Sequence, residues 1–350
     1  MPGLFPRLIS LFAIAALAGC GAESSPRSPA DQIRVVGSST VYPYTTAVAE
    51  QFKLRYSHFS APIVESTGTG GGIKLFCEGR GNNAPDMVNA SRRMKPSEYE
   101  LCARNGISNI IEIKVGLDGL ALARARDGPD FDLTERDVYA AVAATPFGRP
   151  QTARTWRDVN PALPAIRIEV LGPPPTSGTR DSFNELILER GCDSDPAMRA
   201  LKESDPDRHK KVCTAIREDG VFVETGENDN LIVQKLVANP RAVGVFGFSY
   251  VEDNLDRLKP VRIEGVMPTR ETIARFQYPG ARAMYVYVRG DRARTKPGLK
   301  EFLATYANDA AWGPDGFLAM RGMVPATDEV RAEQAQVARA LTPLDPEALK

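Results

Sequence analysis

Residues 66–74, with the sequence STGTGGGIK, hold four glycines within five positions. An apolar, strand-like run precedes them and a helix-like run follows. Glycine has no Cβ atom, so the backbone can turn tightly there and its N–H groups can converge on a ligand. The helix that follows would add the partial positive charge of its N-terminus. The stretch therefore predicts a strand-to-helix turn that binds a small anion.

Two further turns repeat this chemistry. Residues 37–40 (GSST) follow a β-branched run at 33–36 and precede a helical pattern from Tyr44. Residues 177–180 (SGTR) follow an apolar run at 166–171 and open another helical pattern. Three turns rich in Ser, Thr and Gly predict one small oxyanion held by uncharged donors.

Strand-like and helix-like runs alternate after the first 32 residues and predict an α/β fold with an open sheet. We expect strands at residues 33–37, 62–66, 86–91, 110–115, 120–124, 166–171, 243–248 and 284–288, and helices at 44–56, 73–79, 96–105, 134–144, 181–190, 230–238, 297–307 and 328–341. The charged residues 193–211 predict a solvated helical hairpin or loop. A chain of 350 residues suits two lobes rather than one small core. We expect lobe 1 at residues 32–116 and 262–345, lobe 2 at 117–261, and the ligand beyond the carboxyl ends of the strands.

The N-terminal segment predicts export. Arg7 supplies a positive charge, residues 8–17 an apolar core, and residues 17–20 (LAGC) resemble the lipobox of bacterial lipoproteins. We expect a signal peptide at residues 1–19, lipidation of Cys20, and a flexible tether at 20–31. A plain secretory peptide is the alternative. A transmembrane anchor is disfavoured, because the apolar run is shorter than the roughly 20 residues that a span needs.

The balance of charge argues against one class of partner. The chain has 44 basic and 44 acidic residues, and loss of residues 1–19 removes only Arg7, so the mature chain stays near neutral. Nothing in this balance favours nucleic acid. We therefore expect no nucleic-acid partner, and membrane attachment only through the lipid on Cys20.

Four cysteines remain apart from Cys20, and an even count in an exported chain favours two disulfides. Sequential pairing, Cys77 with Cys102 and Cys192 with Cys213, is the simplest of three pairings. Each bond would close a loop within one lobe and contribute about 3 kcal/mol. A zinc site is disfavoured, because the cysteines lack CxxC spacing and nearby histidines. We expect neither a metal nor a cofactor.

Several enzyme classes are disfavoured by the same residues. The dinucleotide motif GxGxxG fails because Ile73 stands where its last glycine belongs, and the P-loop fails because Ile73 again replaces the glycine before Lys74. His58 lies in a polar loop and His209 in a charged run, so neither has the setting of a general base. The esterase motif GxSxG is absent. An esterase or phosphatase is therefore disfavoured.

Five motifs occur in order behind the lipobox-like segment: GSSTVYP, STGTGGGIK, NASRRMK, TSGTRDSF, and ENDNLIVQKL with VGVFGFSYV after it. Together they resemble the periplasmic phosphate-binding proteins of the phosphate ABC transporter, the PstS-like family, over residues 33–250 and more weakly to about 325. The resemblance implies a type II periplasmic-binding-protein fold, with two α/β lobes joined by two crossover strands around a ligand cleft. It also implies a periplasmic monomer without enzymatic activity that captures inorganic phosphate and delivers it to an inner-membrane permease.

Carried over residue by residue, the resemblance implies phosphate contacts at Ser38, Ser39, Thr40, Thr69, Gly70, Gly71, Arg92, Ser177, Gly178, Thr179 and Arg180. Three helix N-termini at roughly half a charge each would nearly balance a phosphate dianion. Ordinary helix capping is the alternative role for the serine and threonine hydroxyls. The alternative for Arg180 is an ion pair with a carboxylate such as Asp181 or Glu227.

The chain departs from the family pattern at two positions. Many members have Asp, which accepts the proton of bound phosphate, where this chain has Arg92, and they have Arg where it has Pro173. This exchange would keep the local charge balance, with Arg92 as a guanidinium clamp. Asp118 and Asp229 are candidate replacements for the acceptor, with a turn or helix cap as their alternative role. Two other functions stay open: a binding protein for sulfate, molybdate or tungstate, and a phosphate-responsive sensory lipoprotein.

Overall fold

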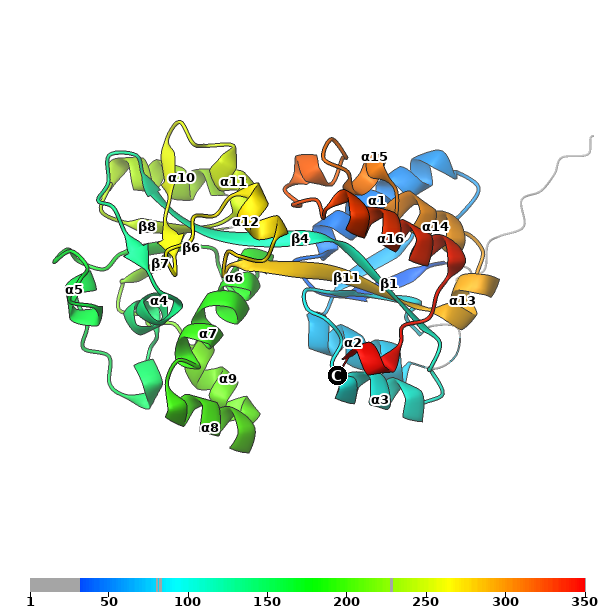
Figure 1. Ribbon diagram of the computed structural model, residues 1–350, viewed down its shortest axis with the longest axis horizontal. Coiled ribbons are helices and arrows are strands. Elements are labelled where there is room, and N and C mark those ends of the chain that lie inside the picture. The colour runs from blue at the N-terminus through cyan, green and yellow to red at the C-terminus, as the bar shows by residue number, and fades with distance from the viewer. Residues whose placement is uncertain (1–31, 80, 82–83, 227–228, 350) are drawn as a thin grey trace, which may run out of the picture.

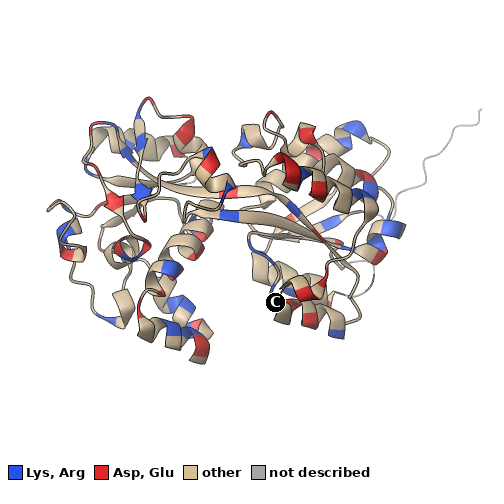
Figure 2. Ribbon diagram, in the orientation of Figure 1, with Lys and Arg blue, Asp and Glu red and all other residues tan. Residues whose placement is uncertain are grey.

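The structure is a computed structural model that describes residues 32–79, 81, 84–226 and 229–349 (Figure 1). The predicted signal peptide, the lipidation site Cys20 and the tether lie outside this part of the chain. Within it, no helix is long and apolar enough to cross a membrane. Acidic and basic residues are interspersed over both lobes (Figure 2), in keeping with their equal numbers.

Two α/β lobes lie side by side, and strands β4 (Ile110–Ala125) and β11 (Ala281–Arg289) run between them (Figure 1). The two strands pair antiparallel, and they join the strands of both lobes into one nine-stranded sheet. The predicted fold with two crossover strands is thus confirmed. The residue boundaries of the lobes stay a prediction, because β4 and β11 are continuous from one lobe to the other.

Lobe 1, on the right in Figure 1, contains β1 (Arg34–Gly37), β2 (Ile63–Ser66), β3 (Met87–Ala90), α1 (Tyr42–Arg55), α2 (Thr69–Glu78), α3 (Pro96–Arg104), α13 (Gly290–Thr295), α14 (Leu299–Tyr306), α15 (Asp309–Trp312), η4 (Ala319–Arg321), α16 (Asp328–Ala340) and η5 (Pro346–Leu349). The strands β2, β1 and β3 are parallel neighbours in that order. Val35 packs into a core with Phe52 and Phe302, whereas Val36 packs into another with Phe76. Successive strand residues face opposite ways, so each face of the sheet carries one core.

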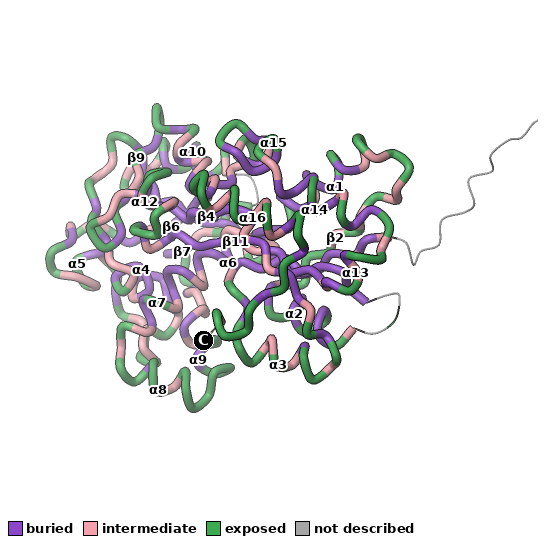
Figure 3. Tube along the Cα trace, turned by 45° about the vertical axis from the view of Figure 1, so that its right-hand side comes forward, coloured by how far each residue is buried: buried purple, intermediate pink, exposed green. Residues whose placement is uncertain are grey.

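Lobe 2 contains β5 (Asp132–Leu133), β6 (Val170–Gly172), β7 (Phe222–Glu224), β8 (Val243–Gly247), β9 (Leu258–Pro260), β10 (Arg262–Ile263), α4 (Glu135–Val142), η2 (Pro146–Gly148), α5 (Trp156–Val159), α6 (Gly178–Phe183), η3 (Asn184–Leu188), α7 (Glu189–Cys192), α8 (Pro196–Ser204), α9 (Pro206–Thr214), α10 (Asp229–Ala238), α11 (Phe248–Glu252) and α12 (Arg270–Ala274). β8, β6 and β7 are parallel neighbours. One core, with Tyr139, Trp156 and Phe183, fills this lobe. Buried residues follow the crossover strands β4 and β11 through both lobes (Figure 3). The predicted charged hairpin forms α8 and α9.

The two helices that follow the second and third Ser/Thr/Gly stretches begin three or four residues earlier than the sequence pattern suggests. α2 begins at Thr69 rather than at residue 73, because the glycines of the turn form its first helical residues. The helix predicted at 181–190 begins at Gly178 as α6 and continues through η3, a π-helical turn, into α7. The N–H groups of both turns are therefore the first N–H groups of helices, which have no acceptor within the helix.

The two strands predicted at residues 110–115 and 120–124 are the single strand β4. The intervening sequence GLDG, at residues 116–119, resembles a turn but is extended. A Cβ on Gly116 would lie 2.3 Å from the sulfur of Met323, and one on Gly119 would lie 2.6 Å from Ile273. These glycines serve close packing at the crossover, and Asp118 between them is a strand residue.

Both predicted disulfides form. Cys77–Cys102 joins α2 to α3 in lobe 1, and Cys192–Cys213 joins α7 to α9 in lobe 2. One histidine does lie near the cysteines, contrary to the prediction made when zinc was disfavoured. A ring nitrogen of His209 lies within 4.8 Å of the sulfurs of Cys192 and Cys213. These sulfurs are bonded to each other and so are not the thiolates that zinc requires.

Candidate functional site

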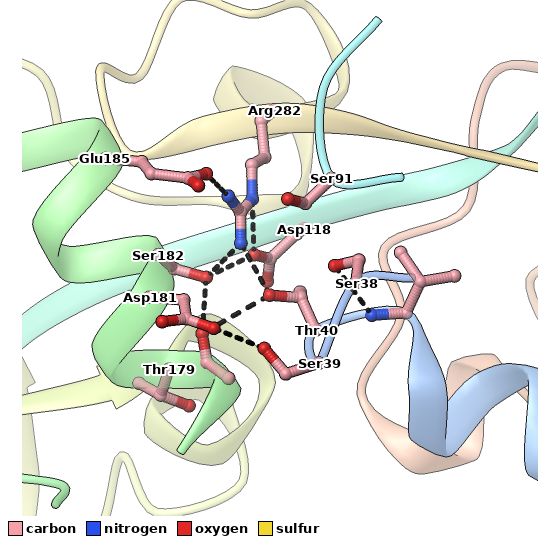
Figure 4. A network of polar contacts seen from close by, with 12 residues as sticks. Ser38, Ser39, Thr40, Ser91, Asp118, Thr179, Asp181, Ser182, Glu185 and Arg282 are labelled. Atoms are coloured by element: carbon pink, nitrogen blue, oxygen red, sulfur yellow. Dashed lines mark hydrogen bonds and ion pairs between the residues drawn. The ribbon is translucent and has the colours of Figure 1, made fainter. Parts of the chain in front are cut away.

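The three predicted turns lie at the carboxyl ends of parallel strands. Residues 38–41 connect β1 to α1, residues 67–68 connect β2 to α2, and residues 173–177 connect β6 to α6. We call them the first, second and third turn. The first and second belong to lobe 1 and the third to lobe 2. The first and third approach each other between the lobes (Figure 4).

The first and third turns line one cavity of about 230 Å³. Its lining is Ser39, Thr40, Pro43, Tyr44 and Gly322 from lobe 1, Asp118 and Gly119 from β4, and Ser177, Gly178, Thr179, Ser182, Gly247 and Ser249 from lobe 2. A Cβ on Gly178 would lie only 3.0 Å from the backbone nitrogen of Thr40, so a side chain there would crowd the first turn. The Thr40 hydroxyl donates to the Gly178 carbonyl at 3.3 Å. Two of the three predicted turns thus meet.

Two of the predicted serines act as caps. Ser177 is the N-cap of α6, and its hydroxyl oxygen accepts a hydrogen bond from the Thr179 N–H at 3.2 Å. Ser38 is buried, and its hydroxyl oxygen accepts from the Val41 N–H at 3.4 Å. Both contacts are of the helix-capping kind, which was the alternative role predicted for these hydroxyls. Ser39 points instead toward the opposite lobe (Figure 4).

The second turn does not line this cavity, although the structure describes all of residues 66–74. The Thr69 hydroxyl oxygen accepts from the Ser91 N–H at 3.1 Å and lies 3.0 Å from the Ser91 hydroxyl oxygen. A Cβ on Gly72 would lie 2.4 Å from the Gly37 Cα atom. The first helical turn of α2 therefore packs directly against the end of β1, beside the first turn.

Arg92 forms an ion pair within lobe 1. Its guanidinium donates to both carboxylate oxygens of Glu98, at 2.9 and 2.7 Å. Burial raises the pKa of Glu98, but the hydrogen bonds from Arg92 and from the Lys95 N–H outweigh burial and hold the pKa below its ordinary value. A Cβ on Gly70 would lie 4.0 Å from the guanidinium, so Arg92 is beside the second turn.

Two other predicted residues lie outside the cavity. Arg180 donates to the Pro173 carbonyl at 2.8 Å and to Glu224 at 3.3 Å, with its guanidinium over the Phe222 ring. Arg180 therefore forms an ion pair, as its alternative role predicted, and the carboxylate is that of Glu224. Asp229, which the structure describes as the first residue of α10, is not among the lining residues.

Arg282 on β11 is the charged residue of the site that sequence reasoning missed. It is 6% exposed and pairs in register with Asp118 of β4. Its Nε donates to Asp118 at 3.0 Å, and its terminal nitrogens donate to Glu185 at 2.5 Å, to Thr40 at 2.7 Å and to the Ser182 hydroxyl (Figure 4). One guanidinium therefore contacts lobe 1, lobe 2 and the other crossover strand.

Asp118 is held from two sides at the cavity wall. Its Oδ2 accepts from Arg282 and, at 2.9 Å, from the Ser182 hydroxyl. Burial, followed by the charge of Asp118, raises the pKa of the nearby Tyr44 well above its ordinary range, although Arg282 acts in the opposite direction. The Tyr44 hydroxyl is therefore neutral, and the charged residue that lines the cavity is Asp118, which is paired with Arg282.

The sequence did contain a signal for Arg282. The run ARAMYVYVR forms a crossover strand in which residues 281 to 284 are all buried, yet its second residue is charged. A charged side chain in a buried strand is costly unless it is paired. An arginine in such a run indicates a carboxylate nearby, but the sequence does not say which one.

Comparison with known proteins shows the family to which the chain belongs. A sequence model of the PBP superfamily domain matches residues 22–309, which is most of the chain. The chain belongs to the PBP superfamily. Protein SphX of Synechococcus elongatus is 32% identical over 282 residues, which cover 78% of this chain and 72% of SphX. Phosphate-binding protein PstS of Staphylococcus saprophyticus is 26% identical over 313 residues, which cover 86% of this chain and 84% of PstS.

Solved structures place this PBP superfamily chain among proteins of the same fold. It is similar to a protein described as a possible phosphate binding protein from Planctomyces limnophilus, with a TM-score of 0.70 and 26% identity, over 88% of this chain and 98% of that one. The fold is that of type II periplasmic binding proteins, as predicted. The predicted resemblance to PstS-like proteins is confirmed.

Proposed function

We propose that this protein captures inorganic phosphate between its lobes and delivers it to the permease of an ABC transporter. The observation that carries the proposal is the meeting of the first and third turns at a cavity lined by Asp118, whose carboxylate is paired with Arg282. Turns that begin helices supply N–H donors and a partial positive charge, which suit a small oxyanion. The name of the relative PstS supports phosphate as that oxyanion.

Asp118 is the proposed acceptor for the proton of phosphate. Among the described residues, its hydrogen bonds from Arg282 and Ser182 both go to Oδ2. A carboxylate has about four acceptor positions, so Oδ1 can accept a further hydrogen bond. A protonated phosphate offers that hydrogen, whereas sulfate has none and would be repelled. Asp118 would thus serve in place of the family carboxylate that Arg92 replaces.

The proposed site extends to the second turn. The N–H groups of Thr69, Gly70 and Gly71 are the first of α2 and lack acceptors within the helix. α2 packs against the end of β1, so its N-terminus lies at the same end of the sheet as the first turn. We include these donors and Arg92 in the phosphate site, on the lobe 1 side.

We also propose the cellular setting that the sequence predicts. The protein would be a periplasmic monomer, attached to a membrane through lipidated Cys20, that binds phosphate without turning over an ester. A chromogenic phosphate ester tests the last point, because sustained hydrolysis would contradict a binding role. Stimulation of phosphate uptake by a reconstituted permease tests the delivery step.

Calorimetric titration tests the ligand. The mature chain is titrated with phosphate, sulfate, molybdate and tungstate between about pH 5 and 9, a range that spans the ionisation of phosphate but not that of sulfate. We expect phosphate to bind most tightly. Asp118→Asn should weaken phosphate binding at least about tenfold, or 1.4 kcal/mol, and weaken sulfate binding less. Tighter binding of sulfate than phosphate by the wild-type chain would overturn phosphate as the ligand.

A matched variant separates the acceptor role of Asp118 from its pairing with Arg282. Glu185 also pairs with Arg282 but does not line the cavity, as the structure describes it. Glu185→Gln removes a partner of the guanidinium and leaves the acceptor in place. We expect a smaller loss of phosphate affinity than in Asp118→Asn. Equal losses would assign the effect to Arg282 rather than to proton acceptance.

A further inference from the structure

The hydroxyl of Ser39 is already engaged in the structure. Ser39, in the first turn, donates a hydrogen bond to Oδ2 of Asp181 in lobe 2 (Figure 4). Ser39 lines the cavity, and its hydroxyl is one of the donors proposed for the anion. A carboxylate of the protein itself therefore takes the hydrogen bond that a bound oxyanion needs.

Asp181 also lies at the helix end that attracts anions. α6 begins at Gly178, and Asp181 belongs to its first turn. The helical run continues through η3 and α7, so it is long enough to have a substantial dipole. A carboxylate in the first turn interacts with the same partial positive charge that a bound anion would use. Asp181 thus opposes anion binding at two points, the Ser39 hydroxyl and the α6 N-terminus.

Among the described residues, Asp181 differs from its neighbours in forming no ion pair. Asp118 and Glu185 both form ion pairs with Arg282. Among the described residues, no Lys or Arg forms an ion pair with Asp181, and the adjacent Arg180 pairs with Glu224 instead. The side-chain contact of Asp181 is the Ser39 hydroxyl, on the opposite lobe. An incoming anion can therefore displace this carboxylate without breaking an ion pair.

We propose that the carboxylate of Asp181 is an internal competitor of the anion and so sets the affinity of the site. An oxyanion that binds Ser39 must first displace Asp181, and the free energy of that displacement is subtracted from the free energy of binding. The inference rests on the proposed function and deepens it, because it names the residue that keeps binding weak enough for release to the permease.

The test is a calorimetric titration of the mature chain and its variants with inorganic phosphate. Asp181→Ala should bind phosphate about tenfold more tightly than the wild-type chain, which corresponds to about 1.4 kcal/mol. Asp181→Asn removes the charge but keeps an acceptor for Ser39, so its gain should be smaller. Glu189→Gln is the matched control, because it removes a carboxylate from the same helical run that forms no hydrogen bond with the first turn among the described residues, and it should leave the affinity within twofold.

A double-mutant cycle isolates the contact itself. Ser39→Ala should cost little affinity in the wild-type background, where the hydroxyl is engaged, and several-fold more in the Asp181→Ala background. Thermal unfolding of each variant verifies that it is folded. Unchanged or weaker binding by Asp181→Ala would overturn the competition and make Asp181 an acceptor or a clamp between the lobes. Failure of the wild-type chain to bind phosphate would instead refute the proposed function.

Discussion

The two sides of the cavity present different chemistry. Lobe 1 contributes uncharged donors, the hydroxyls of Ser39 and Thr40 and the N–H groups of the turn. The other side presents the carboxylate of Asp118 on β4, which is paired with Arg282; Arg282 also pairs with Glu185, and neither of these two residues lines the cavity. In the proposed phosphate site, the groups that attract the anion would therefore differ from the group that selects phosphate. Uncharged donors accept any small oxyanion, whereas fixed carboxylates favour one that carries a proton.

The charged side carries more acid than base. Asp118 and Glu185 share a single guanidinium, that of Arg282, and Asp181 contacts Ser39 without an ion pair among the described residues (Figure 4). Carboxylates near the proposed phosphate site would repel the anion, and the repulsion would grow as the site excludes water. In this proposal the donors of lobe 1 outweigh the repulsion, and Arg282 limits it.

The largest effect on phosphate affinity should come from Arg282→Ala. The change leaves two carboxylates without their cation beside the anion, and removing one member of a buried charge cluster is strongly unfavourable. We expect a loss of at least about a hundredfold in affinity, or 2.7 kcal/mol, by calorimetry. Arg282→Lys keeps the charge without the planar fork, so it should recover part of the loss. A change of less than threefold in Arg282→Ala would make the charged side irrelevant to binding.

Arg92→Ala tests whether a cation of lobe 1 also contributes to phosphate binding. We expect affinity to fall about tenfold, or 1.4 kcal/mol, if Arg92 attracts the anion at the second turn. Glu98→Gln is the companion variant, since it releases the guanidinium from its ion pair and should raise affinity about threefold. Unchanged affinity in both variants would show that Arg92 and Glu98 form a structural ion pair only. Lobe 1 would then contribute no charged group to phosphate binding.

The contribution of the Arg92–Glu98 ion pair to the stability of the fold depends on pH. The pKa of Glu98 is lower in the folded chain than the value of about 4.3 expected when unfolded. The pair therefore stabilises the fold above that value, and its contribution is lost as pH falls through the folded pKa. Between about pH 3 and 6, the melting temperature of the wild-type chain should fall more steeply with acid than that of Arg92→Ala.

Much of the fold could be predicted because its signals are local. Alternating strands and helices, the turns between them and the even cysteine count each depend on neighbours in sequence. The extended crossover at Gly116 and Gly119 could not be predicted, because GLDG has the composition of a turn. What holds it extended is packing against Met323 and Ile273, which are about 150 to 200 residues away in the chain.

The site was predictable in one half only. The residues of the first and third turns that line the cavity could be predicted because helix N-termini have a sequence signature, whereas the second turn does not line it. The charged partners depend on long-range pairing, so Arg282 was missed and the partners of Arg92 and Arg180 were not identified. Which carboxylate an arginine meets depends on the register of β4 with β11, which places Asp118 opposite Arg282, and no local pattern specifies that register.

A smaller effect should distinguish the first turn from the second. Thr40→Val removes a hydroxyl at the cavity that contacts both Gly178 and Arg282, and we expect about a tenfold loss of affinity. Thr69→Val removes a hydroxyl that is bonded to Ser91, so the loss should be about threefold. Calorimetry on both variants measures the ratio. A larger loss in Thr69→Val would place the anion nearer to the second turn.

The smallest effect on phosphate affinity should come from loss of the disulfides. The two disulfides connect different helices. Cys77–Cys102 ties α2, whose N-terminus is part of the proposed site, to α3, whereas Cys192–Cys213 ties α7 to α9 away from the cavity. Replacing either pair by serine should lower the free energy of unfolding by about 3 kcal/mol, because the two loops are similar in length. Chemical denaturation measures that loss.

The two disulfide variants should differ in phosphate affinity, although they lose a similar free energy of unfolding. Without Cys77–Cys102, the N-terminus of α2 is less firmly placed beside the first turn, and we expect about a twofold weaker binding constant. Without Cys192–Cys213, the affinity should not change, so this pair is the matched control. Equal affinities in both variants would mean that packing of Gly72 against Gly37 suffices to position α2. A loss confined to the lobe 2 pair would instead show that the charged side of the cavity depends on the α7–α9 anchor.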